Sequence, residues 1–304
     1  MTAATANVRF LVGSRELLAV PRRVATVAHS LEELVSGAKF KLPPLPDDAD
    51  GYRVLSVPAE AVAEILAHGP GLIPGPVQCY RRHYIAMDGG FESYMAGFSG
   101  KTRSTLRRKL RKFAGADGGA LDLREYRGAD GFDAFLAEAL PLSRATYQGR
   151  LLDAGLPESE AAQAALRDAA GEDRLRTFIL HFGGKPASYL CLPVEGETLV
   201  YAWLGYRPDL AQLSPGTVLQ LAALERLFGE RRFRFFDFTE GEGAHKALFG
   251  TASVEAASLF LLRPRAANRL LLGALEAFDG SVGAVKRMAE RSGALAGARR
   301  LLRS

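Results

Sequence analysis

The sequence contains no run of about 20 apolar residues of the kind that spans a bilayer, and no apolar core of signal-peptide length follows Met1. Its two cysteines, Cys79 and Cys191, are far apart and have the spacing of neither a metal site nor a redox motif. We therefore expect a cytoplasmic protein without a metal site, in which Cys191 is a small buried apolar side chain.

Acidic residues are missing from one stretch, residues 101–112, which holds seven basic side chains. Residues 263–304 carry nine Lys or Arg against three acids, so the rest of the chain is net acidic although the whole has a charge of +5. With 48% hydrophobic and 24% charged residues in 304, the composition is that of a globular protein with one large or two moderate domains. The separation of charge indicates an anionic partner.

Three strands, a helix and a further strand are predicted in the second half of the chain. Short glycine-containing connections separate the three strands, as hairpin loops require. The apolar segment that follows is predicted to be a helix beginning near Ser214, and an aromatic strand comes after it. The predicted strands are 175–182, 187–194, 198–206 and 233–238.

The start of this helix has the residues expected of an anion site. Ser214 suits the N-cap, Pro215 the first helical position, and Gly216 allows a ligand to approach the backbone. Unpaired N–H groups and the helix dipole there favour a phosphate or pyrophosphate. An ordinary capped helix remains the alternative.

These elements resemble a known family. The segment from Phe91 to Gly250 resembles the GNAT-related acyltransferase domain of CelD-like and FemAB-like envelope proteins. The matching pieces are Phe91–Met95, Lys101–Lys112, Ser214–Thr217, and Phe236–Phe238 with Gly241 and Lys246. The resemblance implies that Ser214, Gly216 and Thr217 hold the pyrophosphate of a coenzyme A thioester, which serves as acyl donor.

The loop after the last of these strands departs from the family pattern. Relatives often carry a Tyr-Lys pair where this chain has His245-Lys246, and an Arg-Gly pair where it has Glu240-Gly241, followed by Glu242. His245 is the predicted general base, because an imidazole transfers protons at neutral pH. Glu240 and Glu242 are expected to orient the imidazole, act as the base themselves, or bind a cationic amine. Glu242 as a solvated loop acid is the alternative.

Other residues are assigned to the donor. Lys246 is predicted to contact an anionic group, with a surface lysine as the alternative. The strand 198–206 is expected to polarise the thioester carbonyl through its backbone, and Trp203 to line an acyl or acceptor channel. By alternation Tyr201, Trp203 and Gly205 share one face, and core packing is the rival role for the two aromatic side chains. Asp237 is expected to pair with an arginine or anchor a turn.

The basic run predicts a helix from a cap at Ser99, with Leu106, Leu110 and Phe113 on its inner face. Its Arg107, Arg108 and Arg111 are predicted to contact phosphates of coenzyme A, an acidic acyl-carrier protein, a lipid-linked acceptor or an anionic membrane surface. A solvated face is the alternative, and the scarcity of interleaved aromatic residues argues against nucleic acid. The tail could lie on an anionic bilayer or pack on the protein.

The sequence thus predicts an α/β protein with a GNAT-like mixed, mainly antiparallel sheet flanked by helices. Its expected parts are residues 1–90, a smaller α/β region; 91–262, the acyltransferase domain; and 263–304, a basic helical tail. The predicted function is transfer of an acyl group from acyl-CoA or acyl-carrier protein to an amine of an envelope lipid or saccharide, including a long-chain sphingoid-type amine, at the inner face of the membrane. The alternatives are an aminoacyl-tRNA-dependent FemAB-like transferase and a non-catalytic scaffold for exopolysaccharide assembly.

Overall fold

The computed structural model describes residues 3–12, 15–68, 71–147, 155–241 and 243–291. The chain forms two compact units: unit 1 comprises Met1–Tyr80 and Glu255–Ser304, and unit 2 comprises Arg81–Val254. The chain passes between the units within strands β5 (Gln78–Ala86) and β12 (Ala252–Leu262). The division into residues 1–90, 91–262 and 263–304 stays a prediction about independently folding parts.

Unit 1 is built on a mixed sheet. Strand β2 pairs with β1 in antiparallel and with β3 in parallel orientation, and β12 pairs antiparallel with both β3 and β4. At the β3–β12 contact a Cβ on Gly51 would lie 2.0 Å from the carbonyl oxygen of Leu261, so this register requires glycine. The strands are β1 (Ala4–Val12), β2 (Arg15–Ala28), β3 (Gly51–Pro58), β4 (Ile73–Pro74) and β12.

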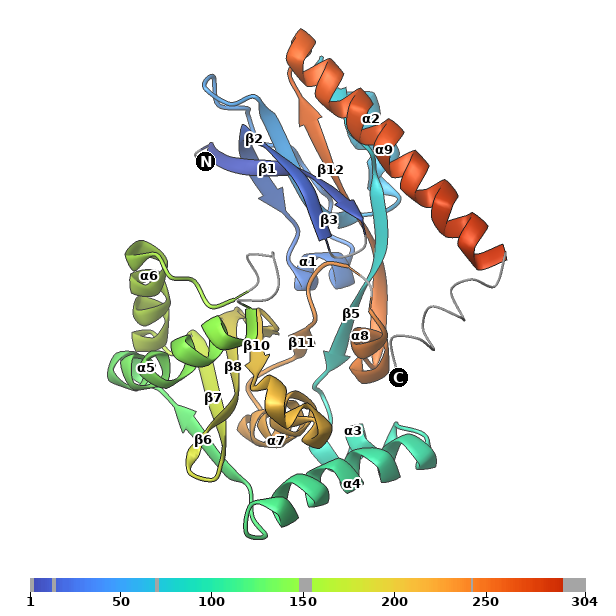
Figure 1. Cartoon of the computed structure of the whole chain (residues 1–304). Helices are drawn as coiled ribbons and strands as arrows, with labels where there is room; N and C mark the ends of the chain where they lie inside the picture. The colour runs from blue at the N-terminus through green and yellow to red at the C-terminus, as the bar shows by residue number, and fades with distance from the viewer. Residues whose placement is uncertain (1–2, 13–14, 69–70, 148–154, 242, 292–304) are drawn as a thin grey trace. The chain divides into compact units, whose positions relative to one another are not determined.

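Helices cover both faces of this sheet (Figure 1). On one face Ile65 of α2 (Ala61–His68) packs with Tyr52 and Val54 of β3. On the other, Leu271 and Leu275 of α9 (Ala266–Arg291) pack with β1. Ser30 caps the short helix α1 (Leu31–Ser36): its side-chain oxygen accepts a hydrogen bond from the backbone N–H of Glu33.

The packing of α9 bears on the two roles considered for the tail. Leu271, Leu272 and Leu275 are buried within unit 1, so these leucines are not available to a bilayer. The alternative in which the tail packs on the protein therefore holds for this part of it. Leu301 and Leu302 lie outside the described residues.

Unit 2 contains the segment that resembles the acyltransferases. Strands β6, β7 and β8 form the antiparallel meander, β9 and β10 both pair with β8, and β11 pairs parallel with β9 and antiparallel with β5. Its remaining elements are α3 (Phe91–Ala96), α4 (Gly100–Ala116), β6 (Asp122–Tyr126), α5 (Gly128–Tyr147), α6 (Glu160–Gly171), β7 (Leu175–Phe182), β8 (Lys185–Glu195), β9 (Thr198–Val200), β10 (Trp203–Tyr206), the 3₁₀ helix η1 (Pro208–Leu213), α7 (Pro215–Glu230), β11 (Phe235–Asp237) and α8 (Ala244–Phe249).

Helices flank the unit 2 sheet on both faces (Figure 1). Phe132 and Phe135 of α5 pack on one face with Tyr189 of β8, and α6 contributes to the same cluster. On the other face α4 and α7 bury Leu106, Phe113 and a run of apolar α7 side chains against β7 and β8. The α/β class and the mainly antiparallel mixed sheet predicted from the sequence are confirmed.

The predicted strand 198–206 is interrupted. Leu199 lies opposite Val194 of β8, but Trp203 lies opposite Cys191, so four residues on one side span three on the other. This single extra residue places Tyr201 in the cluster under α4 and α7, and Trp203 in the cluster under α5 and α6. The prediction that Tyr201 and Trp203 share a face is therefore wrong, because alternation holds only within an unbroken register.

Candidate active site

His245 lies in the first turn of α8, just beyond β11. Its Nε2 is 2.7 Å from Oε1 of Gln220, a side chain of α7 that is 0% exposed. The imidazole lies against the ring of Phe249, with 4.7 Å between centroids, and 6.1 Å from the rings of Tyr201 and Phe238. One hydrogen bond and three aromatic rings therefore fix this imidazole, which keeps part of its own surface exposed.

The surroundings lower the pKa of His245 below its ordinary value. Burial of the ring among protein atoms is the largest cause, and the positive charges of Lys109 and Lys246 act in the same direction. The ring is consequently neutral at neutral pH. A neutral imidazole with an exposed surface is the state that a general base requires.

Gln220 was not singled out in the sequence. It is a single amide in the apolar run Val218–Leu224, and that isolation was the available signal, since an uncharged polar side chain in a buried helix face calls for a partner. Its Oε1 has His245 as partner. Its Nε2 is buried and lacks a hydrogen-bond partner in the part of the chain that the structure describes.

The acidic residues of the loop have different settings. Glu240 is exposed, and its backbone carbonyl accepts a hydrogen bond from Nζ of Lys246. Glu242 lies outside the described residues. The structure thus brings Gln220 to the imidazole, and the roles of both glutamates stay predictions.

Lys246 follows His245 on α8 and is partly buried. Its pKa is lowered, mainly by burial and also by the charge of Arg82, while Asp237 and Glu240 oppose the shift. Together with Lys109 it makes the surroundings of His245 positive. Such a field favours an anionic group of a donor or acceptor next to the base.

Asp237 pairs with an arginine and anchors a turn, as the sequence predicts. Its carboxylate accepts from Nε of Arg82 at 3.1 Å, and both side chains are almost fully buried. It also accepts from the backbone N–H of Thr239 at 2.8 Å, which fixes the turn after β11. The pairing with an arginine and the anchoring of the turn are both confirmed.

The first turn of α7 differs in detail from the expected cap. Ser214 has left-handed backbone angles, φ 55° and ψ 49°, and its side chain makes no capping hydrogen bond. A Cβ on Gly216 would lie 3.0 Å from a methyl carbon of Leu204, so the absence of a side chain there serves packing against β10. Gly216 and Thr217 still belong to the first turn, where backbone N–H groups have no intrahelical partner.

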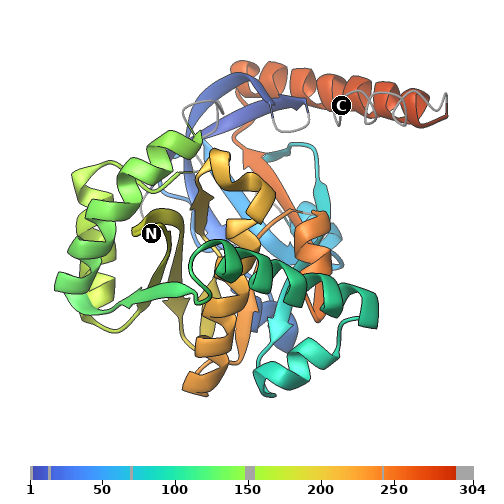
Figure 2. The same ribbon diagram turned by 60° about the horizontal axis from the view of Figure 1, so that its bottom comes forward.

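The basic helix α4 lies beside α7 in unit 2 (Figure 2). Lys112 donates to the backbone carbonyl of Gln212, two residues before Ser214, at 3.0 Å. Arg107 makes a 3.5 Å ion pair with Glu92, while Arg108 and Arg111 are exposed. The α7 turn therefore combines helix N–H groups with nearby lysine charge, which suits a pyrophosphate of a coenzyme A thioester.

Backbone donors for a thioester carbonyl were expected on the strand 198–206. The N–H of Tyr201 donates to the carbonyl of Asp237 at 2.8 Å, and that of Ala202 donates to Val200 at 2.9 Å. These two groups are engaged within the protein. Trp203 is half-buried in the α5–α6 cluster, which is the core-packing role considered for it.

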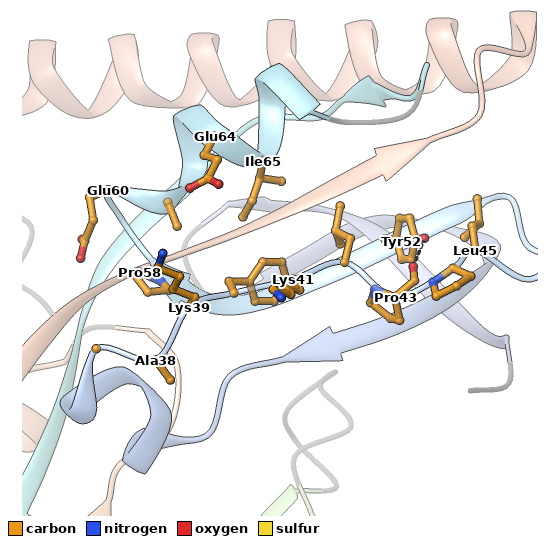
Figure 3. A pocket seen from close by; sticks show the side chains of 15 residues that line it. Ala38, Lys39, Lys41, Pro43, Leu45, Tyr52, Pro58, Glu60, Glu64 and Ile65 are labelled. Carbon is orange, nitrogen blue, oxygen red and sulfur yellow. Dashed lines mark hydrogen bonds between the residues drawn. The ribbon is translucent and has the colours of Figure 1, made fainter.

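A separate pocket of about 760 Å³ lies in unit 1 beneath the segment from Gly37 to Leu45 (Figure 3). Tyr52 and Ile65 contribute apolar surface, and Lys39, Lys41 and Glu64 contribute charge. The eight residues predicted for the site are not among those that line it.

Two kinds of site were searched for in the described residues. No group of three or more His, Cys, Asp or Glu side chains there could hold a metal ion. Across the same residues, no helix is both long and apolar enough to cross a membrane.

The chain has an α/β fold in which a mixed, mainly antiparallel sheet is flanked by helices, and His245 follows strand β11 at the start of α8. A family model described as "Acetyltransferase (GNAT) domain" matches residues 100–247. Residues 100–247 are therefore assigned to a GNAT acetyltransferase domain, and such a domain indicates an acyltransferase enzyme. None of the curated proteins compared with the sequence matches it.

Solved structures share the fold. The crystal structure of FemX is 11% identical, covers 86% of this chain and 89% of its own, and has a TM-score of 0.53. The C-terminal domain of a protein assigned as a lysylphosphatidylglycerol synthetase from Agrobacterium fabrum is also 11% identical, covers 73% of this chain and 71% of its own, and has a TM-score of 0.50. At such low identity these likenesses show the fold alone.

Proposed function

We propose that the protein transfers an acyl group from an acyl thioester to an amine of a cell-envelope lipid or saccharide, with His245 as general base. The observation that carries this proposal is a neutral imidazole held by Gln220 beside two lysines, at the end of a GNAT-type sheet. The positive surroundings suit an acceptor or donor that bears phosphate.

The reaction balances without a further reactant. The amine nitrogen attacks the thioester carbonyl carbon while His245 takes the proton that the nitrogen loses. The carbon–sulfur bond then breaks, the acyl group stays on nitrogen as an amide, and the thiolate leaves and is protonated. The turn Ser214–Thr217 would hold the donor's pyrophosphate, with Lys112 close to it and Lys246 available to an anionic group.

The donor is proposed to be acyl-CoA or an acyl-carrier protein. Exposed Arg108 and Arg111 on α4 present positive charge that either a phosphate-bearing cofactor or an acidic carrier would meet. We propose an envelope lipid as acceptor, including a sphingoid-type amine. One structural neighbour is named as a lysylphosphatidylglycerol synthetase, and lysylphosphatidylglycerol is an aminoacylated phospholipid.

A screen of donors tests the proposal. Acyl-CoAs of increasing chain length are added to the full chain, and amine-dependent release of free thiol is measured. We expect turnover with at least one donor, and a preference for long chains would select a lipid product. Absence of thiol release and of thermal stabilisation with acyl-CoA and acyl-carrier protein alike would overturn it.

The surface of α4 is tested separately. Reversing the charges of Arg108 and Arg111 should weaken binding of acyl-carrier protein strongly and that of acyl-CoA weakly if the carrier docks there. Salt-dependent filter binding of aminoacyl-tRNA to the unmodified chain would instead favour the FemAB-like alternative.

A further inference from the structure

We propose that Gln220 is a positioning residue for acyl transfer: its side-chain carbonyl keeps the hydrogen of His245 on Nε2, which leaves Nδ1 as the nitrogen that accepts the proton of the amine. This inference rests on the proposed role of His245 as the base. It assigns a role to a side chain of α7, outside the helix α8 that bears the histidine.

The first argument is the place of Gln220 in α7. Its neighbours in the helix, Leu219 and Leu221, are 0% exposed, and so is Gln220 itself. An amide there must find partners that leucine would not need. Its Nε2 has none among the described residues, so the fold bears an unfavourable free energy that an apolar side chain would avoid. Such a departure from a stable core is expected where a residue serves function.

The second argument is the direction of the hydrogen bond. A carbonyl oxygen can only accept, so the 2.7 Å contact from Oε1 places a hydrogen on Nε2 of His245. The neutral ring then has its lone pair on Nδ1. The opposite orientation of the amide would put N–H hydrogens against Nε2 and would require the hydrogen on Nδ1, so the two arrangements predict different tautomers.

The third argument is the charge of the partner. A carboxylate at this place would stabilise the imidazolium, whereas an amide adds no negative charge. The charged groups that act on the ring are Lys109 from α4 and Lys246 from α8, both positive. A carboxylate would therefore raise the pKa of the ring and leave more of it already protonated, whereas Gln220 orients the ring and leaves it neutral.

The aromatic contacts complete the positioning. Phe249, Tyr201 and Phe238 pack around the ring at centroid distances of 4.7, 6.1 and 6.1 Å, and the hydrogen bond to Gln220 fixes which ring nitrogen faces α7. Without Gln220 the ring would stay among these aromatic side chains, but neither its tautomer nor its rotation would be fixed by a hydrogen bond.

The test combines a tautomer measurement with kinetics. Imidazole ¹⁵N chemical shifts of His245 are recorded in the full-length protein and in Gln220→Leu, with Gln78→Leu as a control that changes an exposed glutamine. We expect the Nε2–H form in the unmodified protein and a mixture in Gln220→Leu. The kcat of Gln220→Leu should fall at least about tenfold with little change in KM for the thioester, while its unfolding midpoint stays equal or rises.

Three results would overturn the inference: an Nδ1–H form in the unmodified protein, an unchanged tautomer in Gln220→Leu, or a loss of kcat matched by loss of folded protein. Failure of the underlying function has a different signature. If His245→Ala keeps full turnover, the base is wrongly assigned whatever the tautomer. If His245→Ala is inactive and Gln220→Leu is unchanged in tautomer and kcat, only the role of Gln220 falls.

Discussion

Two histidines of unit 2 make a hydrogen bond of the same length to different kinds of partner. His181 of β7 has its Nε2 2.7 Å from a carboxylate oxygen of Glu138, which also accepts from the hydroxyl of Tyr126. His245 has its Nε2 2.7 Å from the amide oxygen of Gln220. The first histidine is 1% exposed, while the second keeps an exposed surface.

The difference separates a histidine sealed inside the protein from one whose ring has an exposed surface. In the first pair the buried atom that lacks a partner among the described residues is Nδ1 of His181 itself, and a substrate cannot reach the lone pair of a buried nitrogen. In the second pair the sealed atom is Nε2 of Gln220, and the histidine faces outward. An equal distance to a polar partner therefore says little about function, whereas the exposure of the ring and the charge of its partner say much.

The largest expected difference between His245 and His181 is in turnover. His245→Ala should lower kcat by about 100-fold or more, as loss of a general base does, with unchanged folding. His181→Phe serves as the matched variant and should retain the kcat of its folded fraction, because the ring is sealed from substrate. Thiol release and circular dichroism on both variants decide it, and equal losses of kcat would erase the distinction.

The second prediction concerns stability. Glu138→Gln leaves one acceptor oxygen where Tyr126 and His181 each use a carboxylate oxygen of their own. Either one of these donors loses its acceptor, or His181 moves its hydrogen to the buried Nδ1, which has no partner among the described residues. We expect the free energy of unfolding to fall by about 1–3 kcal/mol. Glu158→Gln, which changes an exposed carboxylate paired with Arg144, should cost much less, because solvent screens an exposed ion pair. Chemical denaturation measures both, and similar costs would refute the account.

The third prediction is a pH profile. Because the pKa of His245 lies below its ordinary 6.5, the neutral base persists to lower pH than for a solvated histidine. The kcat/KM should be constant near neutrality and fall as the pH drops through a midpoint below 6.5. A midpoint above that value would show that the lysine charges and burial do not govern the base.

The smallest expected effect tests whether the charge of Lys109 helps to lower the pKa of His245. Lys109→Glu replaces a charge that lowers the pKa of His245 by one that raises it, so the midpoint of the profile should move upward. Lys101→Glu makes the same charge change on α4 at a residue that is not among those acting on His245, and should leave the midpoint in place.

Much of the fold could be predicted because its signals are local. The meander strands 175–182 and 187–194 and the helix after Ser214 were visible in apolar runs and short glycine connections. The same locality explains the failure at Trp203. A register shift arises from pairing with β8, which alternation along one strand cannot reveal.

Of the two hydrogen-bonded residues of the candidate site, only His245 could be predicted from the sequence. His245 stood out by its loop, but Gln220 lies 25 residues earlier on another element, and only the packing of α7 against α8 joins them. Ser214 had the composition of a cap, yet its left-handed backbone follows from the 3₁₀ turn that precedes α7. Contacts between elements, rather than residue preferences, decided both cases.

The extra residue between β9 and β10 has a practical consequence for engineering this protein. The extra residue moves each following side chain of the strand to the opposite face of the sheet. A library of mutants designed to repack the cluster around Tyr201 therefore has to include Leu204, which packs in that cluster, and not Trp203. Deleting Ala202 would return Trp203 to that layer and carry Gly205 away from the ring of Tyr189, against which only glycine fits. The presence of this one residue thereby determines whether Trp203 packs under α5 and α6 or under α4 and α7.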